Sequence, residues 1–245
     1  MNRPIVETCL SPALLHLFDT EHTIVVIIDI FRATSTITTA LANGAREVIP
    51  VADVNECITL KSLHPGYITA GERDGKVAPG LEYGNSPFEY PPAFIKDKTL
   101  ALTTTNGTKL LHMVENADQI IIGSFLNLDA VSSYLIRQNK KVLLACAAWK
   151  DRVNKEDSLY AGAVATQLQE HFTIACDSTR LCMDLYEQSR RAPSLLDFLR
   201  DSNHYRRLSS FGLEKDMEFC TTPNQYQVVP RYNGHAIVTE TIPPV

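Results

Sequence analysis

Short, uninterrupted apolar runs alternate with helical stretches through the first two-thirds of the chain. The apolar runs predict strands at residues 24–28, 47–51, 67–70, 99–103, 119–123 and 141–146. The segments between them predict helices at 33–42, after Asp53, and at 107–114, 126–137 and 155–170. Strands without polar alternation are typical of a sheet that is covered on both faces. Their alternation with helices indicates that this sheet is mostly parallel.

Two segments interrupt this rhythm. Residues 72–92 form a long connection rich in Gly and Pro, and loops of that length are commonly functional. From about Cys176 the pattern predicts charged helices, with strand-like pieces at 225–229 and 236–239. We therefore expect a three-layer α/β fold with a mostly parallel or mixed sheet, helices on both faces and a helical C-terminal third. Residues 1–245 then form a single integrated domain, with two lobes at roughly 1–98 and 99–245 as the alternative.

The composition narrows the class of protein. The chain has 245 residues, 44% of them hydrophobic and 21% charged, which excludes fibrous and fully disordered classes. A net charge of −5 argues against a nucleic-acid binder, and no apolar run approaches a membrane span. Six dispersed cysteines without a Cys-x-x-Cys pair argue against a zinc ribbon. With no signal peptide at the N-terminus, we expect a cytoplasmic protein with free thiols.

The strand ends suggest where a ligand binds, because ligands of open α/β sheets lie outside the carboxyl ends of the strands. Asp29 follows the apolar run 24–28 directly. It is either a helix cap or an ion-pair partner of Arg32, or it is a ligand of Mg²⁺, which prefers carboxylate oxygens. Arg32 and the hydroxyls of residues 34–36 open the next helix, and helix N-terminal amides, hydroxyls and an arginine together form an anion site.

Residues 103–108 form a second candidate cradle, with several hydroxyls and backbone amides at a strand-to-helix turn. Threonines there can also be ordinary strand residues, and Asn106-Gly107 can be an ordinary turn. No Gly-Lys-Ser/Thr follows and no Gly-x-Gly-x-x-Gly is present, so we expect neither ATP nor NAD. Polar residues also follow the strand at 119–123 (Ser124, Asn127) and lie in the long loop (Asn85, Ser86).

The sequence gives weaker support to the motifs of other phosphatase classes. The Asp-x-Asp of an aspartyl-phosphate enzyme of the haloacid-dehalogenase type is incomplete, because position 31 is Phe31. Cys146 and Arg152 have the Cys-x5-Arg spacing of a cysteine phosphatase, but no glycine lies between them and Asp151 would repel a phosphate. Cys146 is otherwise read as a small buried hydrophobic residue. No His-x-His or His-Glu-x-x-His motif supports zinc hydrolysis.

Taken together, these motifs resemble the 2-phosphosulfolactate phosphatase family. The matching stretches are DIFRATSTITTALANGA, AGERDGKVAPGLEYGNSPFEY, TTTNGT, IIGSFLN and CAAWKDRVNKEDSLYAGA, with a weaker match in HYRRLSSFGLEKDMEFC. They run in order from about residue 24 to 230. The chain departs from the family at two places, with Ala70 and Ala148 where the family often has glycine. Loss of a glycine can narrow a loop or change its backbone angles.

The resemblance implies a magnesium-dependent hydrolase that converts 2-phospho-3-sulfolactate into 3-sulfolactate and phosphate, a step toward coenzyme M in some organisms. We expect catalytic roles for Asp29, Arg32, Glu72, Arg73 and Asp157. The expected metal ligands are Asp29, then Glu72 and Asp157, with Glu156 in reserve; Glu156 and Asp157 are otherwise ordinary first-turn helix acids. Expected substrate or phosphate contacts are Thr34, Ser35, Thr36, Asn85, Ser86, Thr104, Thr105, Asn106, Gly107, Thr108, Ser124, Asn127 and Cys146.

Several alternatives stay open at this point. Attack by a metal-activated water is favoured, and an aspartyl-phosphate on Asp29 is the alternative. The chain could also be a non-catalytic homologue that keeps the anion pocket. The expected partner is a small anionic phosphorylated substrate, and neither nucleic acid nor a membrane is expected. A soluble enzyme of this size is commonly a homodimer, and we expect one here.

Overall fold

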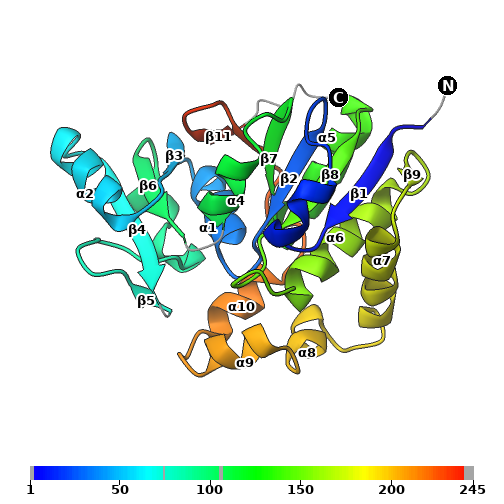
Figure 1. The fold of residues 1–245 in the computed structure, drawn as a ribbon. Helices are drawn as coiled ribbons and strands as arrows, with labels where there is room; N and C mark the ends of the chain where they lie inside the picture. The colour runs from blue at the N-terminus through cyan, green and yellow to red at the C-terminus, as the bar shows by residue number, and fades with distance from the viewer. Residues whose placement is uncertain (1–2, 74, 105–106, 240–245) are drawn as a thin grey trace.

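The computed structural model describes residues 3–73, 75–104 and 107–239. Within them, eleven strands form one sheet (Figure 1). In pairing order they are β5 (Lys76–Val77), β4 (Ile68–Arg73), β6 (Thr99–Thr103), β3 (Glu47–Pro50), β11 (Ile237–Thr239), β10 (Pro230–Tyr232), β7 (Gln119–Gly123), β2 (Ile24–Ile28), β8 (Val142–Cys146), β1 (Ile5–Cys9) and β9 (Thr173–Ile174). The expected mixed, mostly parallel sheet is confirmed.

The sheet consists of two parallel groups joined by a hairpin. Strands β4, β6 and β3 form one group, and β7, β2, β8, β1 and β9 form the other. Between them, β10 and β11 pair antiparallel with each other and with β7 and β3, respectively. Residue 98 is the boundary of the two alternative lobes, and each group of strands combines residues from both sides of it. Strand β6 pairs with β3 and β4, and β2 pairs with β7 and β8.

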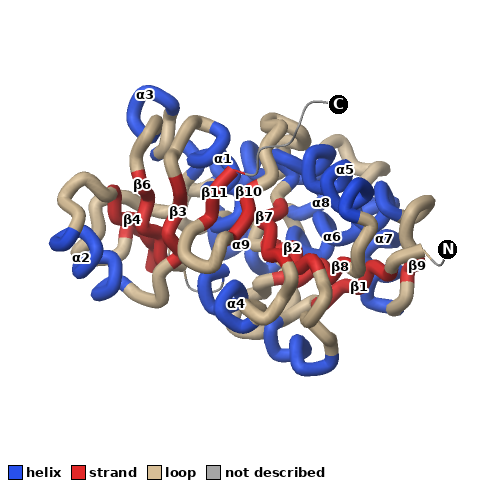
Figure 2. Tube along the Cα trace, turned by 90° about the horizontal axis from the view of Figure 1, so that it is seen from above, coloured by secondary structure: helices blue, strands red, loops and turns tan. Residues whose placement is uncertain are grey.

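Helices cover both faces of the sheet. They are α1 (Ala33–Ala42), α2 (Val54–Leu63), α3 (Pro92–Ile95), α4 (Gly107–Met113), α5 (Leu128–Gln138), α6 (Lys155–Leu168), α7 (Asp177–Ser189), α8 (Leu195–Leu199), α9 (Asn203–Ser209) and α10 (Glu214–Cys220), with 3-10 turns η1 (Pro12–Leu17), η2 (Pro87–Glu89) and η3 (Phe125–Asn127). Figure 2 shows α5, α6 and α7 on one side of β7, β2 and β8, and α4 on the other. The three layers and the helical C-terminal third are confirmed.

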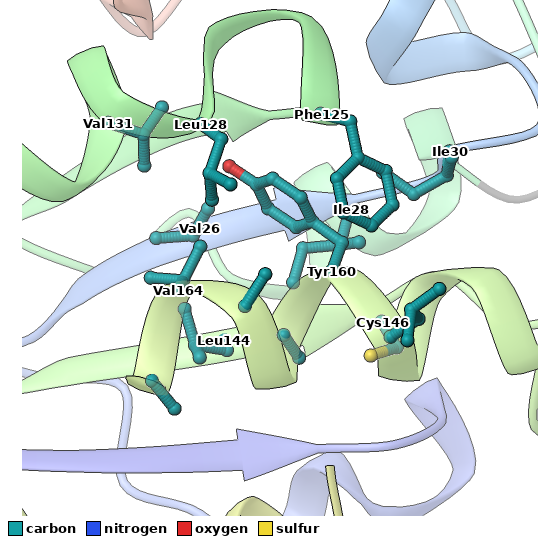
Figure 3. Packing of buried hydrophobic residues seen from close by; sticks show 14 of the residues in the cluster. Val26, Ile28, Ile30, Phe125, Leu128, Val131, Leu144, Cys146, Tyr160 and Val164 are labelled. Carbon is teal, nitrogen blue, oxygen red and sulfur yellow. The ribbon is translucent and has the colours of Figure 1, made fainter. Parts of the chain in front are cut away.

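Strand β2 is the centre of the core. Its five residues are all β-branched and buried, which suits a strand covered on both faces. Alternate side chains point to opposite faces. Val26 therefore packs with Tyr160 of α6 in one hydrophobic cluster (Figure 3), and Ile27 packs with Leu110 of α4 in another.

Helix α7 packs against α6 at close range. A Cβ atom on Gly162 of α6 would lie 1.9 Å from the carbonyl oxygen of Cys182 in α7, so this crossing requires glycine. The close contact anchors α7, after which the chain turns into α8, α9 and α10. Figure 1 shows these three short helices along the lower edge of the sheet.

The differences from the sequence prediction lie at the margins of the sheet. Strands β1, β5 and β9 were not predicted, because they are short or contain polar residues. The predicted strand at 225–229 is wrong: β10 begins at Pro230, and the preceding residues instead bond to η3, with the Tyr226 N–H donating to the Leu126 carbonyl. No helix in the described part of the chain is long and apolar enough to cross a bilayer.

Candidate active site

A small polar cavity lies where the loops after β2, β4, β6 and β8 meet helix α9. We call it the inner cavity; it is lined by Asp29, Phe31, Arg32, Glu72, Asn85, Thr104, Trp149, His204, Arg207 and Leu208. Its volume of about 30 Å³ accommodates one or two water molecules. Polar residues at the ends of β2, β4 and β6 therefore meet here, whereas Ser124 and Asn127 after β7 do not line the cavity.

Asp29 is the buried acid of this cavity. It ends β2, and its carbonyl accepts hydrogen bonds from both the backbone N–H and the hydroxyl of Thr34, which fixes the start of α1. Burial raises the pKa of its carboxyl to about 6. His204 lowers this pKa, whereas the nearby carboxylates of Glu156 and Glu72 raise it further. The pocket thus concentrates negative charge that protein cations offset only in part.

Arg32 is held by an acid from the other end of the chain. It is 5% exposed, and its Nη1 donates to Oδ2 of Asp216 in α10. The Phe31–Arg32 peptide bond is cis. The sequence alternative in which Asp29 pairs with Arg32 is therefore wrong, because Asp216 takes that place. Asp216 lies 184 positions away along the chain and was not predicted.

Asp157 connects three segments around the cavity without lining it. It is fully buried at the start of α6 and accepts hydrogen bonds from the Ile30 N–H (2.9 Å), the Ala148 N–H (3.3 Å) and the Asn154 amide (3.3 Å). Burial and the neighbouring carboxylates of Glu156 and Asp29 raise its pKa well above the usual range. Both carboxylate oxygens are occupied by these donors, so Asp157 positions the loops after β2 and β8.

Glu156, His204 and Arg207 form a hydrogen-bonded chain beside the cavity. Nη2 of Arg207 donates to Nε2 of His204 over 2.7 Å. Arg207 can only donate, so Nε2 of His204 is the acceptor there, and Nδ1 of His204 hydrogen-bonds to Oε1 of Glu156. The other oxygen of Glu156 is buried and has no hydrogen-bond partner among the described residues.

Two further residues line the inner cavity with oxygen atoms that could bind a metal, Glu72 in β4 and Asn85 in the long loop. Glu72 accepts a hydrogen bond from the Gly75 N–H through Oε2, and Oδ1 of Asn85 is buried without a partner in the described structure. Nowhere in residues 3–73, 75–104 and 107–239 do three acidic, histidine or cysteine side chains converge as a ready metal cage. The predicted set of four acidic ligands is therefore not assembled as a cluster: Asp29 and Glu72 line the cavity, while Glu156 and Asp157 lie behind it.

Comparisons of the sequence with known proteins identify its family. The profile of the family described as 2-phosphosulpholactate phosphatase matches residues 9–235. The chain belongs to this family. A protein of Thermotoga petrophila named probable 2-phosphosulfolactate phosphatase is 42% identical over 88% of this chain and 92% of its own length. Proteins with the same name from Thermotoga maritima and Caldanaerobacter subterraneus are 40% and 38% identical, covering 88% of this chain and 92% and 90% of their own lengths. The expectation of an enzyme of the phosphoric monoester hydrolase class is thereby confirmed.

Most of the family's hydroxyl and amide motif residues support the loops around the cavity. The hydroxyls of Thr34, Ser35 and Thr36 donate to the carbonyls of Asp29, Ile30 and Asn85, so they fix α1 and the long loop. Ser86 caps η2, while Ser124 and Asn127 bond to each other at η3. Gly107 and Thr108 begin α4, and Thr105 and Asn106 lie outside the described residues. Among the members of this set that the structure describes, Asn85 and Thr104 are the ones that line the inner cavity.

Two further predicted residues lie away from the cavity. Arg73 is exposed, and its Nη1 donates to the carbonyl of Glu72. Cys146 is buried in the hydrophobic cluster under β2 (Figure 3), where burial raises the pKa of its thiol well above its usual value. An apolar, protonated thiol is a poor nucleophile.

The residues at the site that sequence reasoning missed include His204, Arg207 and Asp216. They lie on two short helices, α9 and α10, in the region where the pattern predicts only charged helices. Their only signal was the weaker family match HYRRLSSFGLEKDMEFC.

Ala148 has a backbone conformation that favours glycine. Its φ is +59°, and its N–H donates to Asp157. An alanine in this region is strained by about 1 kcal/mol relative to glycine. We expect Ala148→Gly to raise the free energy of unfolding by about 1 kcal/mol, measured by urea denaturation. Ala147→Gly is the matched control: Ala147 is as buried as Ala148 but has no such φ, so its replacement relieves no strain and should lower stability. A loss of stability in Ala148→Gly would contradict the expectation.

Proposed function

We propose that this chain hydrolyses the phosphate ester of 2-phospho-3-sulfolactate, giving 3-sulfolactate and inorganic phosphate, with Mg²⁺ as its cofactor. Family membership supports the reaction class, and the names of the relatives support the substrate. The observation that carries the proposal is the inner cavity, where a buried acid and a buried arginine line the same small space. That pair suits a phosphate bound together with a cation.

The residues present fit a magnesium ion. Mg²⁺ is bound by hard oxygen donors, usually one or two carboxylates with the remaining positions filled by water and substrate phosphate. Asp29 supplies a buried carboxylate, Asn85 a buried carbonyl oxygen without a partner, and Glu72 a second carboxylate on the cavity wall. Burial, and then the neighbouring carboxylates of Glu156 and Glu72, raise the pKa of Asp29, and a bound cation would offset this cost of a buried charge. When bound, the ion would neutralise phosphate charge and polarise the phosphoryl oxygen.

The chain's own residues then bind and orient the ester. Arg32 is fixed by Asp216, so its guanidinium can bind phosphate oxygens with little loss of side-chain entropy. Asp157 holds the loops after β2 and β8 in register. In hydrolysis a water oxygen bonds to phosphorus, the ester P–O bond breaks and the leaving alkoxide takes up a proton. Asp29 and Glu72 are the carboxylates on the cavity wall that can orient the water or accept its proton.

Removal of divalent cations tests the proposal directly. We expect phosphate release from 2-phospho-3-sulfolactate to stop in EDTA and to return on addition of excess Mg²⁺, measured by a colorimetric phosphate assay. Mg²⁺ should also raise the melting temperature, because a ligand that binds only the folded state stabilises it. Turnover that persists in EDTA would contradict the magnesium requirement. No release from any of a panel of phosphorylated hydroxy acids would instead indicate a non-catalytic anion-binding protein.

A further inference from the structure

A second, larger cavity adjoins the inner one. We call it the outer cavity; its volume is about 510 Å³, and it is lined by Trp149, Arg152, Val153, Asn154, Lys155, Asp201, Ser202, Asn203, His204 and Arg207. Trp149, His204 and Arg207 line both cavities and so form the wall between them. These three side chains can therefore contact a ligand bound in either cavity.

The two cavities have opposite charge. The inner cavity has two carboxylates, and its one arginine besides Arg207 is neutralised by Asp216. The outer cavity adds Arg152 and Lys155 to Arg207 against one acid, Asp201, which pairs with Lys155 over 2.6 Å. The inner cavity therefore suits a phosphate that binds together with a cation, and the outer cavity suits an anion that binds without one.

Arg207 has a hydrogen-bond donor without a partner in the described structure. Its guanidinium stacks on Trp149, with Cζ 4.5 Å from the ring centroid, and Nη2 donates to His204. Its Nε–H is buried without a hydrogen-bond partner in the described part of the chain, where no carboxylate lies within ion-pair distance of it. A half-buried guanidinium with a buried Nε–H and no counter-charge is costly, and a ligand anion would offset that cost.

We infer that Arg207 binds a second acidic group of the substrate, the sulfonate, and so determines which phosphoesters the enzyme accepts. This rests on the proposed function and specifies its substrate recognition. The sulfonate is the acid farther from the ester carbon, so it is the group that extends farthest from the phosphate toward Arg207. Trp149 supports the guanidinium from one side, and Glu156 orients it through His204.

Steady-state kinetics on a matched pair of substrates test this role. The pair is 2-phospho-3-sulfolactate and 2-phospholactate, which keeps the carboxylate but lacks the sulfonate. In Arg207→Gln we expect kcat/KM for the first to fall about 100-fold, mainly through KM, and that for the second to change less than about 3-fold. Arg206→Gln, on the exposed neighbour in the same helix, should change neither. Equal losses for both substrates in Arg207→Gln would overturn the inference.

Binding of the product tests the same contact without turnover. Trp149 is the single tryptophan of the chain, so its fluorescence reports on the wall directly. Titration with 3-sulfolactate should give a saturable change in wild type and Arg206→Gln, no saturable change in Arg207→Gln, and none with lactate in wild type. No response in wild type, or an equal one in Arg207→Gln, would overturn the inference. A wild-type response without phosphate release would leave the sulfonate contact standing while the proposed hydrolysis fails.

Discussion

Asp29→Asn should reduce phosphate release by about 1,000-fold or more while making the metal-free protein more stable. Asparagine has nearly the same shape, so the packing around the inner cavity is kept. It removes the charge that a cation needs and also removes the cost of burying that charge. Activity and stability are therefore expected to change in opposite directions in one variant.

The pKa of Asp29 gives the sign of the stability change. Burial raises it from the ordinary value of 3.8 to about 6. At pH 7 the carboxyl is ionised in both states, and ionisation is less favourable in the folded one, so the group destabilises the native protein. Removing the charge should then stabilise it by on the order of 2 kcal/mol. This contribution disappears as pH falls from about 6 toward 4, so metal-free wild type approaches the variant there.

Urea denaturation in EDTA, phosphate assays and a magnesium thermal shift check these outcomes together. Asp184→Asn, on the exposed face of α7, is the control and should leave all three unchanged. The variant Asp29→Asn should also lose the rise in melting temperature that Mg²⁺ gives the wild type. Turnover at the wild-type level in Asp29→Asn would remove this residue from the proposed site.

The fold follows from the sequence where burial is two-sided. Runs such as residues 24–28 and 119–123 have no polar alternation, and the structure confirms strands β2 and β7 at these positions. The two strands at the far end of the sheet lack this pattern: the edge strand β9 has two residues, and β1 beside it has two consecutive polar residues, Glu7 and Thr8. The hairpin that joins the two parallel groups comes from the last residues of the described chain, and no local pattern specifies that long-range pairing.

The candidate site likewise has a part that the sequence predicts and a part that it does not. Asp29 and Thr104 directly follow β2 and β6, and Arg32 lies in the turn after β2, so the rule about the carboxyl ends of strands predicts their positions. Asp216 reaches Arg32 from α10 only through tertiary packing. The spacing of residues in the sequence also does not predict which way a side chain points. Two neighbouring acids in one helix turn have different partners: Glu156 contacts His204, and Asp157 contacts the backbone of two loops.

Asp157→Asn should lower the free energy of unfolding by about 2 kcal/mol, the opposite of Asp29→Asn, because the hydrogen bonds that it breaks outweigh the relief of burying a charge, which the raised pKa of Asp157 also implies. Asp157 receives N–H donors on both oxygens, from Ile30 on Oδ1 and from Ala148 and Asn154 on Oδ2. An amide in its place presents its own NH₂ group to one of these sides. At least one buried backbone N–H then loses its acceptor, and two donors face each other.

Urea denaturation of Asp157→Asn beside Asp177→Asn separates this effect from a change in helix charge. Asp177 also lies in the first turn of a helix, α7, but is exposed, so its replacement costs at most the helix-dipole contribution of about 0.3–1 kcal/mol. The magnesium thermal shift distinguishes the two roles of Asp157. If Asp157 positions the loops, the folded fraction of the variant still responds to Mg²⁺ although its stability has fallen. A variant that is as stable as wild type but no longer responds to Mg²⁺ would instead indicate that Asp157 is a metal ligand. In that case the substitution abolishes binding of the ion without disturbing the three segments that this carboxylate connects.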